Sequence, residues 1–299
     1  MAKVTANGIE IEYESSGAPD APAVLLIMGL GAQLLRWPAE LVESLVERGY
    51  RVIRFDNRDV GLSTKFDAAG TPSMAMMAAS RVFRRPLRAP YSLADMAGDA
   101  AGLLDALEIG KAHIVGASMG GMIAQLFAAR WPKRTLSLTS IMSSTGNPAL
   151  PGASLQTMGL LLRRPRARDL ETVVAHGVKV SKVLAGSLPE DEARLAARYR
   201  EEVLRNHHPA GFVRQMAAII ADGDRRARLK TIAAPTVVVH GSDDPLVPVA
   251  AGRDTAASIR GARLVEIPGM GHTMPPEVVP ALVAAFESVA RPAGWARAA

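Results

Sequence analysis

The chain has 299 residues, of which 48% are hydrophobic and 21% are charged, and it contains no cysteine. This length and composition are typical of a globular protein that can bury a core, and they exclude a disordered chain, disulfide bonds and thiolate metal sites. The net charge is +6, and residues 147–230 hold 15 basic and 9 acidic side chains, so this segment alone accounts for the excess.

A basic surplus raises the question of nucleic acid. Aromatic residues make up only 4% of the chain, and no stacking platform or recognition motif accompanies the basic residues. We therefore interpret the excess charge as a solvated surface and expect no nucleic-acid partner. The N-terminus lacks an apolar stretch of signal-peptide length, and polar residues interrupt the longest uncharged run, between Arg134 and Arg163. These features favour a cytoplasmic protein without a membrane partner.

The first elements along the chain are predicted to be strands. Residues 3–15 alternate apolar and polar side chains around the dipeptide Asn7-Gly8, a pattern typical of a β-hairpin. Residues 23–27 are continuously apolar, as in a strand that is buried on both faces. Residues 50–55 form the next predicted strand after an intervening helix, and a polar loop, residues 56–63, follows it.

The middle of the chain continues this alternation. Ser92 is a typical helix N-cap, and the apolar spacing after it predicts a helix to Gly110, which would cap the C-terminus. Residues 66–90, which precede this helix, are expected to be irregular. A further strand is predicted at residues 135–142.

From residue 144 to residue 234 the spacing of apolar residues indicates helices only. Strands are predicted again at residues 236–240 and 263–267. Repeated strand–helix units predict an α/β protein with a mostly parallel central sheet and helices on both faces. We predict a core formed by residues 1–146 and 231–299, with a helical cap inserted at residues 147–230. The functional site is expected at the carboxyl ends of the strands.

The stretch Lys111 to Gly121 carries the strongest chemical signal. It reads K-A-H-I-V-G-A-S-M-G-G, and it combines an apolar strand, a tight turn and the start of a helix around the pattern G-x-S-x-G. At such a turn the serine adopts a strained backbone conformation with its hydroxyl exposed, and the glycines allow strand and helix to approach. Ser118 is therefore the candidate nucleophile.

An activated serine needs a base and a group that orients the base. Of the six histidines, only His272 lies in a glycine-containing loop just beyond a late strand, so we predict it to be the general base. His113 and His240 lie in strands and are interpreted as packed core residues. His207 and His208 have no further ligands at metal-binding spacing, so no metal site is expected.

The orienting carboxylate is predicted in the sequence Gly241-Ser242-Asp243-Asp244-Pro245, which directly follows a strand. Asp243 and Asp244 compete for this role, and either could instead serve a turn. The chain order of serine, aspartate and histidine is that of α/β-hydrolases and not that of the main serine-protease families.

Together these pieces resemble the α/β-hydrolase-fold esterases along nearly the whole chain, especially the branch of bacterial carboxylesterases, the aclacinomycin methylesterase and the cofactor-free haloperoxidases. The matching pieces are Met28-Gly29-Leu30-Gly31, Phe55-Asp56-Asn57-Arg58-Asp59-Val60-Gly61-Leu62-Ser63, Gly116-Ala117-Ser118-Met119-Gly120-Gly121, Gly241-Ser242-Asp243-Asp244-Pro245 and Gly269-Met270-Gly271-His272. The resemblance implies that Asp244 is the triad member.

The same resemblance implies an oxyanion hole formed by the backbone N–H groups of Leu30 and Met119. Many relatives have His-Gly where this chain has Met28-Gly29. The donor is a main-chain group, so this departure should preserve the hole while removing a side chain that could hold the loop. Residues 56–63 are expected to serve structure, with Arg58 and Asp59 fixing the loop.

These expectations combine into hydrolysis of carboxylic esters through Ser118, His272 and Asp244, with an acyl-enzyme intermediate and no cofactor. The apolar run at residues 155–162 suggests an apolar acyl or alcohol pocket for a small-molecule ester, although the same run could simply pack between cap and sheet. Two activities that use the same triad remain open, namely perhydrolysis of the haloperoxidase type and cleavage of a C–C bond next to a ketone. A ligand-binding module without catalysis is the alternative from another class. The sequence does not determine the oligomeric state.

Overall fold

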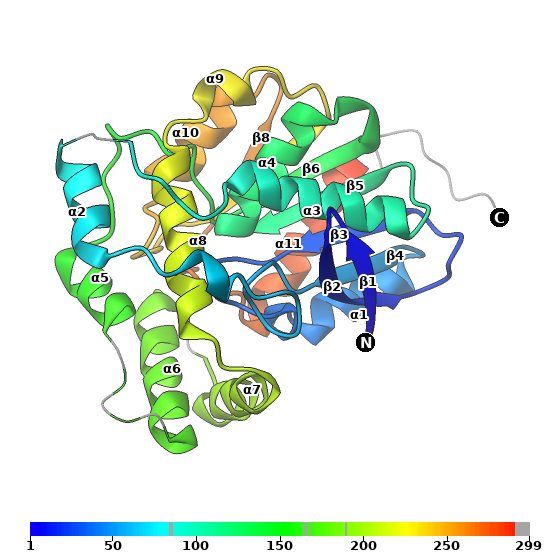
Figure 1. Ribbon diagram of the computed structural model, residues 1–299. Coiled ribbons are helices and arrows are strands. Elements are labelled where there is room, and N and C mark those ends of the chain that lie inside the picture. Colours follow the sequence, from blue (N-terminus) through cyan, green and yellow to red (C-terminus); the bar gives the residue numbers. More distant parts are fainter. Residues whose placement is uncertain (84–85, 164, 166, 168, 189, 291–299) are drawn as a thin grey trace.

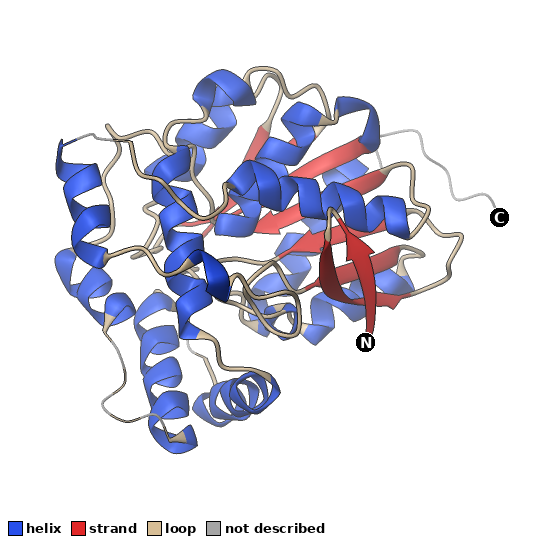
Figure 2. Cartoon of the chain, viewed as in Figure 1, coloured by secondary structure: helices blue, strands red, loops and turns tan. Residues whose placement is uncertain are grey.

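The protein is built around one eight-stranded, mostly parallel β-sheet with helices on both faces, so the predicted α/β fold is confirmed (Figures 1 and 2). The computed structural model describes residues 1–83, 86–163, 165, 167, 169–188 and 190–290. The strand order is β1-β2-β4-β3-β5-β6-β7-β8. The strands are β1 (Ala2–Ala6), β2 (Ile9–Ser16), β3 (Ala23–Ile27), β4 (Arg51–Phe55), β5 (Ala112–Ala117), β6 (Thr135–Ile141), β7 (Thr236–Gly241) and β8 (Arg263–Ile267).

The antiparallel part of the sheet is confined to its N-terminal edge. Strands β1 and β2 form the predicted hairpin, and β2 also pairs antiparallel with β4. Asn7 and Gly8 both have positive φ angles, 49° and 78°, which a two-residue hairpin turn with the twist of its strands requires. From β4 to β8 all pairs are parallel, so the carboxyl ends of these strands lie at one edge of the sheet.

Two hydrophobic layers cover the sheet. Strands β3, β5 and β7 are buried along their whole length, as their continuous apolar runs predict. Helices α3 (Leu93–Ala106) and α4 (Met119–Arg130) contribute to the core on one face, and α1 (Ala39–Glu47) and α11 (Val279–Ala290) contribute to the core on the other. The central sheet is therefore enclosed between two apolar layers.

Helix α3 confirms the predicted start and corrects the predicted end. The Ser92 side chain accepts a hydrogen bond from the N–H of Asp95, and the Asp95 carboxylate accepts one from the N–H of Ser92, which completes a capping box. The prediction that Gly110 caps the other end is wrong, because the helix ends at Ala106 and Glu108 takes the left-handed conformation with φ of 56°. This earlier turn lets Ile109 donate to the Leu104 carbonyl at 2.8 Å and pack against the core.

Between β6 and β7 the described chain contains no strand and forms helices, as expected. They are α5 (Leu155–Leu162), α6 (Leu170–Leu184), α7 (Glu192–Arg205), α8 (Pro209–Asp222) and the short α9 (Arg226–Leu229). Figure 1 shows α5 to α8 beside one edge of the sheet. The division into a core and a cap at residues 147–230 stays a prediction, and residues 291–299 of the predicted core lie outside the described part of the chain.

The expectation that residues 66–90 are irregular is wrong for Met74–Phe83, which form helix α2. The reason is tertiary, since buried Met77 packs against Met216 and Ala217 of helix α8. Among the described residues, no helix has both the length and the apolar character needed to cross a membrane. The cytoplasmic location expected from the sequence stays a prediction.

Candidate active site

Ser118 lies in the turn between strand β5 and helix α4, where its φ and ψ angles are 56° and −120°. A β-carbon on Gly116 would lie 2.1 Å from the Gly120 carbonyl oxygen, and one on Gly120 would lie 1.9 Å from the carbonyl oxygen of Ile27. Both positions therefore require glycine. The strained serine conformation expected from G-x-S-x-G is present.

His272 follows strand β8, and its ring faces Ser118. The Nε2 atom of His272 lies 2.9 Å from the Oγ of Ser118, within the range for proton transfer between a nucleophile and its base. The His272 side chain is only 7% exposed, so little water competes for this contact. The structure thus brings together two residues that are 154 positions apart in the chain.

Asp244 follows strand β7 and completes the chain of contacts, with its Oδ2 atom 2.7 Å from the Nδ1 of His272. Burial alone would raise the pKa of Asp244, but the charge of His272, hydrogen bonds from His240 and His272, and the N–H of Val247 hold this pKa well below its usual range. An ionised carboxylate only accepts hydrogen bonds, so Nδ1 of His272 carries the proton. In the uncharged ring, the Nε2 atom is then free to accept the proton of Ser118.

The choice between the two adjacent aspartates is visible in their contacts. Asp243 accepts hydrogen bonds from the hydroxyls of Ser187 and Ser242, which lower its pKa. It has no hydrogen bond to His272. The geometry therefore agrees with Asp244, the aspartate before proline, as the partner of His272.

Two of the other histidines, His113 and His208, have contacts away from Ser118. His113 is buried, lies 2.8 Å from the Ser137 hydroxyl and stacks edge-on with Tyr50 and Phe286. The Nε2 of His208 lies 2.9 Å from Arg214 and 3.1 Å from Asp67. Among the described residues, no group of histidine, aspartate and glutamate side chains is arranged so that it could hold a metal ion.

His240 has a role that sequence reasoning missed. It is fully buried, its Nε2 donates to the Val247 carbonyl at 2.7 Å, and this nitrogen lies 3.5 Å from Asp244 Oδ2. His240 therefore supports the loop that carries Asp244. Its position four residues before Asp244, at the end of a strand, was the available signal.

The Met28–Gly31 loop approaches Ser118 from strand β3. A β-carbon on Gly29 would lie 3.1 Å from the Ser118 β-carbon, so this loop is in contact with the serine. Within the described residues, the backbone N–H groups of Leu30 and Met119 have no hydrogen-bond partner in the chain. Both groups thus remain available to a bound oxygen atom.

Two amide side chains that sequence reasoning missed hold this loop. Asn57 Nδ2 donates to the Met28 carbonyl at 2.8 Å, and the N–H of Gly31 donates to Gln215 Oε1 at 2.8 Å. Gln215 lies in helix α8, 184 positions further along the chain. No local pattern in the sequence pairs these residues.

Residues 56–63 serve structure, as expected for Arg58 and Asp59. Arg58 donates from Nε and from an Nη atom to Asp99, with both distances 2.6 Å. Asp59 accepts two hydrogen bonds from Arg214 of helix α8, at 2.7 and 2.8 Å, and one from the Tyr91 hydroxyl. Arg214 is only 1% exposed, so a buried ion pair joins this loop to the helical segment.

The helical segment also contacts the loop that carries His272. Just beyond helix α6, the N–H of Gly271 donates to the Ala185 carbonyl at 3.0 Å, and the N–H of His272 donates to the Leu184 carbonyl at 2.6 Å. The N–H of Ser187 donates in return to Gly269. The helical segment therefore contacts both the histidine loop and the Met28–Gly31 loop.

The apolar run at residues 155–162 is divided in the structure. Leu155 is 93% exposed, whereas Leu162 packs in a cluster with Met77, Met216 and Phe212. This cluster also includes Leu30 of the loop beside Ser118. Apolar surface therefore adjoins the serine, but only part of the predicted run contributes to it.

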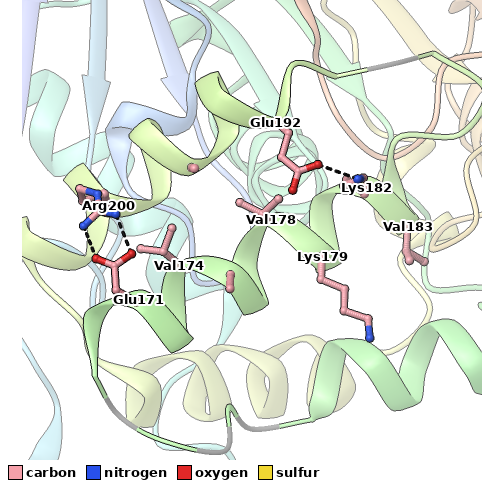
Figure 3. Close-up of a pocket in the computed structure, with 10 residues that line it drawn as sticks. Glu171, Val174, Val178, Lys179, Lys182, Val183, Glu192 and Arg200 are labelled. Atoms are coloured by element: carbon pink, nitrogen blue, oxygen red, sulfur yellow. Dashed lines mark hydrogen bonds and ion pairs between the residues drawn. The ribbon is translucent and has the colours of Figure 1, made fainter.

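A separate concavity lies on the outer side, between helices α6 and α7 (Figure 3). Its floor contains Val174 and Val178, and ion pairs between Arg200 and Glu171 and between Lys182 and Glu192 flank it. None of its lining residues belongs to the hydrogen-bonded set around Ser118.

Residues 22–277 match the alpha/beta hydrolase fold family, so the chain belongs to this family and is a hydrolase. It is 30% identical to the rhodomycin D methylesterase of Streptomyces sp. strain C5, over 95% of each chain. It is 31% identical to the 2-hydroxy-6-oxononadienedioate/2-hydroxy-6-oxononatrienedioate hydrolase of Paraburkholderia xenovorans, over 88% of this chain and 84% of the relative. The crystal structure of a hydrolase from Pseudomonas aeruginosa superposes with a TM-score of 0.70 at 27% identity, covering 96% of this chain and 97% of the other.

Proposed function

We propose that the protein hydrolyses carboxylic esters through Ser118, His272 and Asp244. The observation that carries the proposal is the continuous hydrogen-bonded chain from the Ser118 hydroxyl through the His272 ring to the Asp244 carboxylate. Such a chain lets a serine act as a nucleophile near neutral pH, because the base removes its proton and the carboxylate stabilises the resulting imidazolium.

The proposed reaction has two halves. Ser118 Oγ attacks the ester carbonyl while His272 takes its proton, and the tetrahedral oxyanion accepts hydrogen bonds from the N–H groups of Leu30 and Met119. His272 then gives the proton to the departing alcohol, leaving an acyl-enzyme. Water, deprotonated by His272, releases the acid and restores Ser118. The reaction needs no cofactor.

The proposed substrate is an apolar small-molecule ester. The cluster around Leu30, which includes Met77, Phe212 and Met216, supports an apolar partner next to the reacting carbonyl. The methylesterase relative supports ester hydrolysis on this fold. We assign the helices of residues 147–230 to a cap that shapes this surface.

A second candidate is hydrolysis of a C–C bond with the same three side chains. The similarity to the 2-hydroxy-6-oxononadienedioate hydrolase supports it. The two reactions share the nucleophile and differ in the leaving group, which is an alkoxide in one and a carbanion in the other. Ester hydrolysis is the simpler reaction because an alkoxide is a better leaving group than a carbanion, and the imidazolium protonates it as it departs.

The test is a panel of p-nitrophenyl esters from acetate to palmitate, run beside 2-hydroxy-6-oxononadienedioate as the C–C substrate. We expect turnover of one or more esters that exceeds C–C cleavage, and a loss of kcat on the order of 10⁴-fold or more in Ser118→Ala. Faster C–C cleavage would favour the second candidate. Ester turnover that Ser118→Ala leaves unchanged would contradict both, and tight ligand binding without any Ser118-dependent turnover would indicate a binding module.

A further inference from the structure

The side chain of Gln215 bridges two loops at the candidate active site. Its Oε1 accepts a hydrogen bond from the N–H of Gly31, and its Nε2 donates to the carbonyl of Arg58, each at 2.8 Å. The side chain is fully buried in helix α8. Both ends of a buried amide are thus satisfied by backbone groups of the core.

The bond to Gly31 acts on the residue directly after Leu30. Gly31 has a φ of 66°, and a β-carbon there would lie 2.7 Å from the Phe212 ring of the same helix. Gly211, one residue earlier, approaches the Asp59 carbonyl so closely that its own β-carbon would lie 2.1 Å away. Helix α8 therefore packs closely against both the Met28–Gly31 loop and the loop of residues 56–63. The position of the helix along these loops determines where Gln215 meets Gly31.

The other end of the loop is held from the core, where Asn57 donates to the Met28 carbonyl. The Met28 side chain itself contributes little hydrogen bonding that could hold the loop, because a thioether is only a weak acceptor. The peptide between Leu30 and Gly31 is thus fixed on one side by a residue of the helical segment. Moving this peptide would move the N–H of Leu30 relative to Ser118.

We propose that Gln215 is a positioning residue for the oxyanion donor Leu30. This inference rests on the proposed function, because an oxyanion forms only if Ser118 attacks a carbonyl. Gln215 does not touch the reacting atoms. It fixes the Gly31 N–H so that the preceding N–H points toward the place where negative charge develops, and such preorganisation is a large contribution to catalysis.

The experiment compares Gln215→Met with Gln125→Met, using the full chain and p-nitrophenyl butyrate. Gln125 of helix α4 is also fully buried; its Nε2 donates to the Ser140 hydroxyl at 3.1 Å, its Oε1 accepts from Arg225 Nε at 3.5 Å, and it has no hydrogen bond to the Met28–Gly31 loop. Both variants lose a buried amide of the same size. Each is characterised by kcat, KM and its melting temperature.

For Gln215→Met we expect kcat to fall about 10- to 100-fold with KM within about threefold, because a misplaced donor weakens transition-state binding more than substrate binding. Gln125→Met should lower the melting temperature by a similar amount and keep kcat within about threefold. Gln215→Glu, which keeps an acceptor for Gly31, should recover several-fold of the lost kcat.

A normal kcat in folded Gln215→Met would overturn the proposal, and so would an equal loss of kcat in Gln125→Met. If Gln215→Met does not fold, Gln215→Asn replaces it, since the shorter amide cannot span both loops and should lower kcat about 10-fold. These results are separable from a failure of the proposed function. That failure would appear as wild-type protein whose ester turnover is absent or independent of Ser118.

Discussion

Charged side chains are arranged very differently on the two sides of the helical segment. On the inner side, Arg214 of helix α8 is 1% exposed and pairs with Asp59, which is fully buried. On the outer side, Arg200 and Glu171 pair across helices α6 and α7 with side chains 42% and 70% exposed (Figure 3). The distances are comparable, so burial, and not contact geometry, distinguishes the two sides.

The difference shows which side of the helical segment contacts the candidate active site. The inner side joins helix α8 to the loops around Ser118, and the end of helix α6 to the loop of His272. The outer pairs lie in water, where screening and side-chain entropy leave an ion pair little net stabilisation. Substitutions on the inner side should therefore change activity and stability, whereas the outer pairs should tolerate them.

The largest effect is expected at the carboxylate that orients His272. Asp244→Asn should lower kcat on the order of 10⁴-fold, because the amide favours the wrong histidine tautomer while leaving the fold intact. Esterase kinetics with p-nitrophenyl butyrate measure the loss. Asp243→Asn is the matched control at the adjacent position, and it should keep most of the activity. Equal losses in the two variants would contradict the assignment.

A large effect on stability is expected for the buried ion pair of helix α8. Arg214→Met should lower the free energy of unfolding by about 3–5 kcal/mol, because it leaves Asp59 buried without its cation. Urea unfolding followed by circular dichroism gives this value. A change no larger than that in Arg200→Met would show that burial does not distinguish the two sides.

A smaller effect on stability is expected at acid pH, where Asp59 becomes protonated. Burial alone would raise the pKa of Asp59, but hydrogen bonds from Arg214, Phe66 and Tyr91 lower it below the usual 3.8. The stabilisation from ionised Asp59 is therefore complete above pH 3.8 and is lost as pH falls through the lower, folded-state pKa.

We expect the melting temperature of the wild type to exceed that of Asp59→Asn near neutral pH. The gap should narrow as the pH falls below 3.8, because the unfolded wild type then binds a proton that its folded state binds only at lower pH, and the variant binds this proton in neither state. Thermal melts across the acid range measure this gap. A gap that stays constant in acid would contradict the lowered pKa.

The smallest effect is expected on the outer side. Arg200→Met removes the exposed pair with Glu171 and should leave the melting temperature and the esterase rate unchanged within error. Differential scanning fluorimetry measures the melting temperature, and the ester assay measures the rate. A clear loss of either would show that the outer concavity between helices α6 and α7 contributes to the protein's stability or function.

The sequence predicted those parts of the fold and site whose signals are local. The alternating strands and helices, the hairpin at Asn7-Gly8 and the turn at Ser118 each depend on a short pattern, and the structure confirms them. The choice of His272 follows from its place after a strand. Because parallel strands end at one edge, residues at successive strand ends meet there.

Other parts of the site depend on contacts between distant segments. Gln215 and Gly31 meet only because helix α8 packs over the loop, and no period in either segment signals this. Helix α2 likewise forms where Met77 packs against side chains of helix α8. The predicted end of helix α3 was wrong, because packing of Ile109 against the core outweighed the general preference for glycine as a helix C-cap at Gly110.

The most direct test of the central claim is chemical labelling of the nucleophile. The purified protein is treated with a fluorophosphonate, which reacts with serines activated by a neighbouring base, and the adduct is located by mass spectrometry of its peptides. We predict one adduct, on Ser118, and its loss in Asp244→Asn together with ester turnover. An adduct on another residue, or full ester turnover after complete labelling of Ser118, would contradict the account.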